Sequence, residues 1–175
     1  MGETDVAEDR LRAFHRTIVQ SSRDGYTPLR TTTLQIFASV GGEDAIYVSG
    51  QLQSGSAPHG SAKGRLVIFT TTRVAVVDLD DAPDGAVGVP SVQGAVGITV
   101  IPRGSLRRVD VKFPKQSANT GPRFRSDEPD WDWHTEVHLT YAPREDPIVL
   151  VEGHSREPLS VFYSSLIEDL APGAV

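Results

Sequence analysis

The sequence predicts a mainly β fold: a bent antiparallel sheet or barrel of seven to eight strands, capped by a C-terminal helix and preceded by an extra N-terminal helix. Segments of alternating or β-branched residues follow one another between residues 31 and 152. Gly, Pro, Ser and Asp separate these segments as turn residues do. A wide apolar stripe with helical spacing comes last, and such a helix needs a sheet to pack against.

Residues 5–20 have the pattern of an amphipathic helix. Asp5 and Glu8 fit a capping box at its start. The apolar positions recur with helical spacing: Ala7, Leu11, Phe14 and Ile18. We therefore expect residues 1–30 to form a helix and linker, and residues 31–175 to form a single domain.

Eight strands are expected in this order: Thr31–Val40, Ala45–Leu52, Arg65–Thr72, Arg73–Leu79, Ile98–Pro102, Leu106–Phe113, Trp131–Tyr141 and Ile148–Val151. The first is rich in β-branched residues, and Gly41-Gly42 after it is interpreted as a tight turn. In Trp131–Tyr141 apolar and polar residues alternate strictly, as a half-buried antiparallel strand requires.

The last element is a helix over residues 156–170. Ser155 is its expected N-cap, and Pro158 is tolerated in a first turn. Its apolar face consists of Leu159, Phe162, Tyr163, Leu166, Ile167 and Leu170. If this helix plugs the barrel, the interior is filled. The alternative is an eight-stranded up-and-down barrel, like that of the lipocalins, with an internal cavity for a small ligand.

Short and long connections alternate along the predicted strands. The long ones are 53–64, 80–97 and 114–130. In an antiparallel meander, successive turns lie at opposite ends of the sheet. The three long loops are therefore expected on one rim, where binding sites usually lie.

Two passages resemble a known family. Residues 64–77 form an apolar strand that ends in Thr, followed by Arg73 at the start of the next strand; Ile101-Pro102 then precedes Leu106–Val111. This order is similar to that of bacterial and GRAM-type members of the pleckstrin-homology-like family. The resemblance implies a seven-stranded bent sheet plugged by the C-terminal helix, and a non-catalytic protein-interaction module. It does not extend to phosphoinositide binding, because the first long loop carries Lys63 alone.

Composition excludes several classes of function. The 17 Lys and Arg against 23 Asp and Glu give a net charge of −6, which argues against a general nucleic-acid binder. No Cys is present, so thiol nucleophiles and Cys-ligated metals are excluded. The sequence shows no signal peptide or membrane-spanning run, and we expect a cytoplasmic protein. Nucleotide-binding and hydrolase motifs are also missing, so we expect neither a cofactor nor enzymatic turnover.

A basic segment interrupts this acidic chain. It consists of Arg103, Arg107, Arg108, Lys112, Lys115, Arg123 and Arg125. The only acid among them is Asp110, so the segment predicts a site for an acidic or phosphorylated protein partner. The alternative is that these residues form the solvated side of a strand, neutralised by the acids that follow. Only Phe113 and Phe124 are available for stacking on bases, so a protein partner is favoured over nucleic acid. Homo-oligomerisation stays open.

His134, Glu136 and His138 are the candidate metal ligands. On a strand, residues at this spacing point to one face, and two imidazoles with a carboxylate are suitable ligands for zinc or iron. Three ligands on one flat strand rarely converge on a single ion. We therefore interpret them as the polar side of a half-buried strand and expect no metal site.

Overall fold

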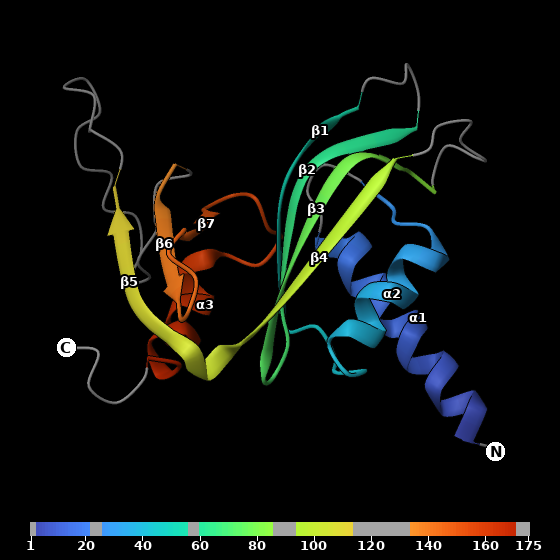
Figure 1. The fold of residues 1–175 in the computed structure, drawn as a ribbon, viewed down its shortest axis with the longest axis horizontal. Helices are drawn as coiled ribbons and strands as arrows, with labels where there is room; N and C mark the ends of the chain where they lie inside the picture. Colours follow the sequence, from blue (N-terminus) through green and yellow to red (C-terminus); the bar gives the residue numbers. More distant parts are fainter. Residues whose placement is uncertain (1–2, 22–25, 56–59, 86–93, 114–133, 171–175) are drawn as a thin grey trace. The chain divides into compact units, whose positions relative to one another are not determined.

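The computed structural model describes residues 3–21, 26–55, 60–85, 94–113 and 134–170, and it is mainly β (Figure 1). Its elements are α1 (Glu3–Ser21), α2 (Arg30–Ser39), β1 (Tyr47–Ser54), β2 (Ser61–Phe69), β3 (Arg73–Pro83), β4 (Ala95–Pro102), a 3-10 turn (Arg103–Ser105), β5 (Leu106–Lys112), β6 (Glu136–Tyr141), β7 (Ile148–Val151) and α3 (Leu159–Glu168). The chain divides into two compact units. The N-terminal unit comprises Met1–Arg103 and His154–Arg156, and the C-terminal unit comprises Gly104–Gly153 and Glu157–Val175.

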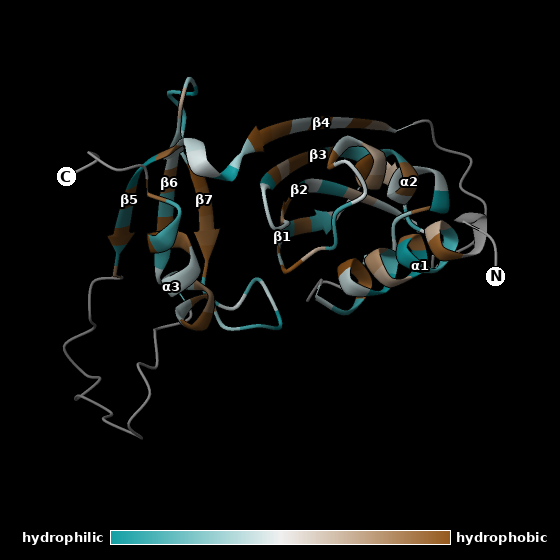
Figure 2. Cartoon of the chain, turned by 90° about the horizontal axis from the view of Figure 1, so that it is seen from below, coloured by the Kyte–Doolittle hydropathy of each residue, from teal (hydrophilic) through white to brown (hydrophobic). Residues whose placement is uncertain are grey.

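The N-terminal unit is built on an antiparallel sheet of order β1-β2-β3-β4. Both α1 and α2 cover the same face of this sheet (Figures 1 and 2). Because alternate strand residues point to that face, the helices and strands share one apolar core. The core consists of Phe14, Ile18, Tyr26, Ile36, Val40, Val48, Ala62, Leu66, Ile68, Ala75, Val77, Leu79 and Ala82. The N-terminal helix is confirmed, although it begins at Glu3, so that Asp5 lies inside it rather than at its cap.

The strand expected at Thr31–Val40 is a helix, and that prediction was wrong. Residues 30–39 form α2, whose buried side consists of Thr32, Thr33 and Ile36. These positions and Val40 follow a spacing of one, three and four residues, which is a helical stripe and not the period of two of a strand. Burial of this stripe in the core outweighs the low helix propensity of three consecutive threonines.

Gly41 and Gly42 end α2 instead of joining two strands. Both have left-handed backbones, with φ of 71° and 73°. The Gly41 N–H donates to the Ala38 carbonyl at 3.0 Å, and the Gly42 N–H donates to the Phe37 carbonyl at 2.9 Å. This pair of bonds is a Schellman motif, which supplies partners to the last carbonyls of a helix and favours glycine after the C-cap.

The C-terminal unit contains an antiparallel sheet of order β5-β6-β7. Its apolar residues alternate along the strands as predicted, and those that are fully buried are Leu106, Val137, Leu139, Tyr141, Ile148 and Leu150. Helix α3 lies beside this sheet (Figures 1 and 2) and buries Leu159, Phe162 and Leu166.

Helix α3 starts three residues after the expected start at Arg156. Pro158 is the N-cap residue and makes no side-chain cap. A residue that precedes proline is disfavoured in helical conformation, so Glu157 does not continue the helix backwards. Instead, the Glu152 carboxylate accepts a hydrogen bond from the Ser160 N–H at 3.2 Å. The start of α3 is thus capped from the end of β7, and Ser155 plays no part in it.

The described residues therefore contain seven strands, in two open sheets of four and three. The eighth strand that the up-and-down barrel needs is absent from them, because its segment is α2. The strand ends that precede and follow the β1–β2 and β3–β4 connections lie at one end of the four-stranded sheet, opposite the turn between β2 and β3. The third long connection, 114–130, lies outside the described residues, so the single rim of three loops stays a prediction.

The turn between β2 and β3 is held by the Glu43 carboxylate. Its Oε2 accepts hydrogen bonds from the Thr70 hydroxyl at 2.7 Å and from the Thr72 N–H at 2.9 Å, and its Oε1 accepts from the Thr72 hydroxyl. Desolvation by burial acts to raise the pKa of Glu43. The hydrogen bonds from the two threonines and the nearby Arg73 charge outweigh it and hold this pKa below its ordinary value of 4.5.

We expect Glu43→Gln to lower the free energy of unfolding by about 2 kcal/mol at neutral pH, because a neutral amide replaces a charged acceptor. A carboxyl group whose pKa is depressed by folding stabilises the protein above its unfolded pKa, and loses this contribution as the pH falls through its folded pKa. The difference between wild type and variant in urea unfolding should therefore shrink below about pH 4. Asp44→Asn, at an exposed neighbouring carboxylate, is the control. A difference that is unchanged at pH 3 would contradict this role of the Glu43 charge.

Candidate functional site

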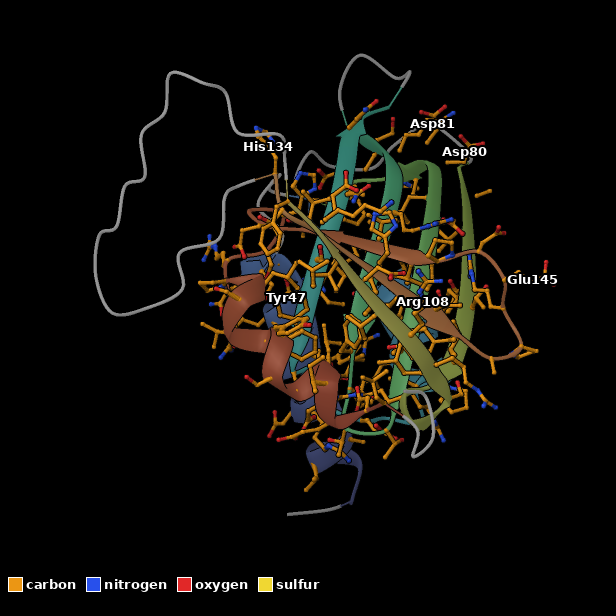
Figure 3. All side chains as sticks on the ribbon, turned by 90° about the vertical axis from the view of Figure 1, so that its left-hand side faces the viewer. Tyr47, Asp80, Asp81, Arg108, His134 and Glu145 are labelled. Carbon is orange, nitrogen blue, oxygen red and sulfur yellow. The ribbon has the colours of Figure 1, made fainter. Side chains whose placement is uncertain are left out.

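The exposed part of the basic segment lies on β5. Arg107, Arg108 and Lys112 are all exposed on this strand, and Figure 3 shows Arg108 on it. The other predicted residues of the segment beyond β5 lie outside the described residues: Lys115, Arg123 and Arg125.

Arg103 is separate from these exposed residues. Its side chain is buried, and its Nη1 donates to the Thr70 carbonyl at 3.0 Å. Its backbone N–H donates to the Thr72 carbonyl at 2.9 Å. Arg103 therefore binds the same β2–β3 turn that Glu43 holds, and its contacts are structural.

One row of side chains on β5 is charged along its length. Arg108, Asp110 and Lys112 alternate along the strand and so share a face. The Arg108 Nε lies 2.8 Å from Asp110 Oδ2, with 71% and 37% of the two side chains exposed. An ion pair this exposed contributes at most about 1 kcal/mol, so a partner carboxylate can replace Asp110 at little cost.

Arg107 and Lys112 have no ion-pair partner among the residues that the structure describes. Arg107 is an extra residue in the ladder: Leu106 pairs with Tyr141 and Arg108 pairs with Thr140. Bulges of this kind turn a side chain out of the regular pattern. Lys112 lies opposite Glu136, but the Glu136 carboxylate is 2.7 Å from the His138 Nε2. Within the described part of the chain, the two cations are thus exposed and without an opposite charge beside them.

β5 is also an edge strand. It pairs with β6 on one side, and no strand of the described chain pairs with its other side, which we call the β5 edge. The backbone N–H and C=O groups on such an edge are a template for another extended chain. Its charged residues keep the edge from pairing with an ordinary apolar strand.

In contrast, Lys63, which was expected in the first long loop, and Arg65 both lie on β2, and both have ion-pair partners. Lys63 Nζ lies 2.9 Å from Asp80 Oδ1, and Arg65 Nε lies 2.6 Å from Asp78 Oδ1. Asp80 is at the end of β3, as Figure 3 shows. These two β2 cations are therefore paired with carboxylates of β3, unlike Arg107 and Lys112.

The three candidate metal ligands do not form one row. β6 begins at Glu136, so His134 lies in a turn before the strand, and the expected strand at Trp131–Tyr141 is shorter than predicted. Figure 3 shows His134 at the end of the sheet away from Arg108. His138 and Glu136 are bonded to each other. The described residues contain no group of three or more His, Asp or Glu side chains that could hold a metal ion.

A second feature was not predicted from the sequence. A cleft of about 700 Å³ lies between α1 and the chain from Thr27 to Thr33. It is lined by Glu8, Leu11, Arg12, His15, Arg16, Val19, Gln20, Thr27, Arg30 and Thr33. Its two walls are separate in sequence and meet only in the folded N-terminal unit. No sequence signal marks it, because polar residues beside an apolar stripe are typical of the exposed face of any amphipathic helix.

None of the described helices is both long enough and apolar enough to cross a membrane. Comparison with family models, with curated proteins and with solved structures finds no match to this chain. The candidate sites therefore have to be judged on their own geometry.

Proposed function

We propose that this protein is a non-catalytic interaction module of the pleckstrin-homology-like type, and that the β5 edge binds an extended, anionic segment of a partner protein. The observation that carries the proposal is the combination of Arg107 and Lys112, both exposed and without ion-pair partners among the described residues, on a strand that is an edge of the described sheet. The order of four strands, three strands and a C-terminal helix supports the family resemblance.

The mode of binding follows from strand geometry. A segment added to the β5 edge forms main-chain hydrogen bonds, and every second of its side chains faces the row of Arg108 and Lys112. Acidic or phosphorylated residues at these positions make opposite-charge cross-strand pairs, each of which contributes about 0.2–1 kcal/mol. Arg107 and Arg108 add bidentate recognition of a carboxylate or phosphate group.

The test uses capped octapeptides and fluorescence anisotropy. The first alternates Glu with Val, the second alternates phosphoserine with Val, and the third alternates Lys with Val. We expect the two anionic peptides to bind and the cationic one not to bind. The ratio of their affinities distinguishes carboxylate from phosphate as the preferred source of charge. Added salt should weaken binding, since the Debye length is about 8 Å at physiological ionic strength.

The double variant Arg107→Glu/Lys112→Glu should weaken binding of the anionic peptide about tenfold, because attraction becomes repulsion at two positions. Its thermal midpoint should stay close to that of wild type, because both side chains are exposed. Arg156→Glu, at an exposed arginine outside the C-terminal unit, is the matched control. Equal weakening by the control, or amide chemical-shift changes that avoid β5, would show that the β5 edge is not the binding surface.

A further inference from the structure

The cleft between α1 and residues 27–33 has the size of a small-molecule site. Its volume of about 700 Å³ falls within the range typical of pockets that hold drug-sized ligands. All of its lining residues belong to the N-terminal unit, so it is separate from the β5 edge.

The charges of the lining are unbalanced. Glu8 Oε2 lies 2.7 Å from the Arg30 Nη2, and Glu8 Oε1 lies 3.5 Å from the Arg12 Nε. One carboxylate thus faces two guanidinium groups and links α1 to the start of α2. Arg16 follows Arg12 by one helical turn and has no ion-pair partner within the described residues. The described residues of the lining therefore include three arginines and one acid.

The wall beneath these charges is apolar and neutral. Leu11 is buried and Val19 is half-buried, and both line the cleft. Between them His15 Nδ1 lies 2.8 Å from the Thr33 hydroxyl oxygen. Desolvation by burial lowers the pKa of His15, which disfavours the charged form of this ring. The Thr33 hydroxyl donates to the Leu29 carbonyl at 3.2 Å, which leaves its oxygen to accept from His15 Nδ1–H.

We propose that this cleft binds a small organic monoanion, a carboxylate on an apolar chain, with the carboxylate at Arg16 and the chain against Leu11 and Val19. Arg16 is the guanidinium group that is free to form a bidentate contact with a carboxylate. Glu8 already pairs with Arg30 and Arg12, so Arg16 is the one guanidinium group of the described lining without an ion pair, and a single such group matches a single carboxylate. The apolar wall removes the chain from water.

Decanoate is the probe, and isothermal titration calorimetry with the full chain is the measurement. Decylammonium has a chain of the same length with the opposite charge, and butyrate has the same charge with a short chain. We expect decanoate to bind saturably, and decylammonium and butyrate to bind at least tenfold more weakly. Equal binding of decylammonium would show that the chain binds by unspecific apolar adsorption, and would overturn the proposal. So would the absence of saturable decanoate binding, or binding to phosphatidylglycerol vesicles alone.

Three variants locate the site. Arg16→Gln should weaken decanoate binding about tenfold, the effect of losing a charge-assisted hydrogen bond. Val19→Trp should block the apolar wall; Gln20→Trp, at an exposed lining position, serves the same purpose if Val19→Trp does not fold. Arg107→Gln, on β5, should leave decanoate binding unchanged. If Arg16→Gln and Arg107→Gln behave alike, the cleft is not the site, whereas loss of peptide binding at the β5 edge has no bearing on this result.

Discussion

Ile36→Ala is expected to lower the free energy of unfolding by about 3 kcal/mol, whereas Leu34→Ala is expected to change it by less than about 0.5 kcal/mol. Ile36 is fully buried in the core of the N-terminal unit, and its truncation leaves a cavity there. Leu34 is 48% exposed on the same helix and loses little on truncation.

This pair of variants distinguishes a helix from a strand at residues 30–39. On a strand, side chains two residues apart point to the same face, so the two truncations would have similar costs. On a helix the same two side chains lie on nearly opposite sides. Urea unfolding followed by circular dichroism measures both. Equal losses for Leu34→Ala and Ile36→Ala would contradict α2.

The error at this segment has a physical origin. Thr31, Thr32 and Thr33 are β-branched, and Gly41-Gly42 is typical of a hairpin turn. The same glycines are equally suited to a Schellman motif, and only the core shows which is formed. Propensity is a weak local preference, and the packing of Ile36 and Val40 outweighs it.

Strands β6 and β7 were predictable because one residue in two is buried along them, and β2 and β3 because each contains a run of four buried residues, most of them β-branched or aromatic. β7 occupies the predicted residues 148–151, and β3 and β5 begin at the predicted Arg73 and Leu106. Where a prediction from the sequence was wrong, the group that determines the local structure lies outside the segment itself. The cap of α3 comes from Glu152, eight residues before the Ser160 N–H that it binds.

Of the candidate sites, one could be predicted from the sequence and the other could not. The basic segment is a cluster of positive charge that is visible in the sequence. It includes Arg107 and Lys112, which are exposed in the structure. The segment also includes Arg103, which is buried. Its guanidinium group donates to the carbonyl of Thr70, 33 residues earlier, and the sequence does not show this contact. The cleft could not be predicted, because it depends on how residues 27–33 fold back along α1.

The second large loss of stability is expected from truncation of a buried side chain of α3, in the C-terminal unit. Six apolar residues of the last helix were expected on one face, but among its described residues the buried ones are Leu159, Phe162 and Leu166. Ile167 is 41% exposed, although it is adjacent to Leu166. We therefore expect Leu166→Ala to lower the free energy of unfolding by about 3 kcal/mol and Ile167→Ala to lower it by less than about 1 kcal/mol.

Urea unfolding measures this difference, and the peptide assay connects it to the β5 edge. Leu166 is buried and does not belong to the exposed row on β5, so its truncation acts on the stability of the unit alone. Leu166→Ala should therefore bind the anionic peptide with wild-type affinity in the absence of urea, and lose binding at a lower urea concentration than Ile167→Ala. Reduced affinity without urea would show that α3 contributes to the binding surface. Equal urea midpoints for the two variants would mean that the buried side of α3 is not the one assigned by the structure.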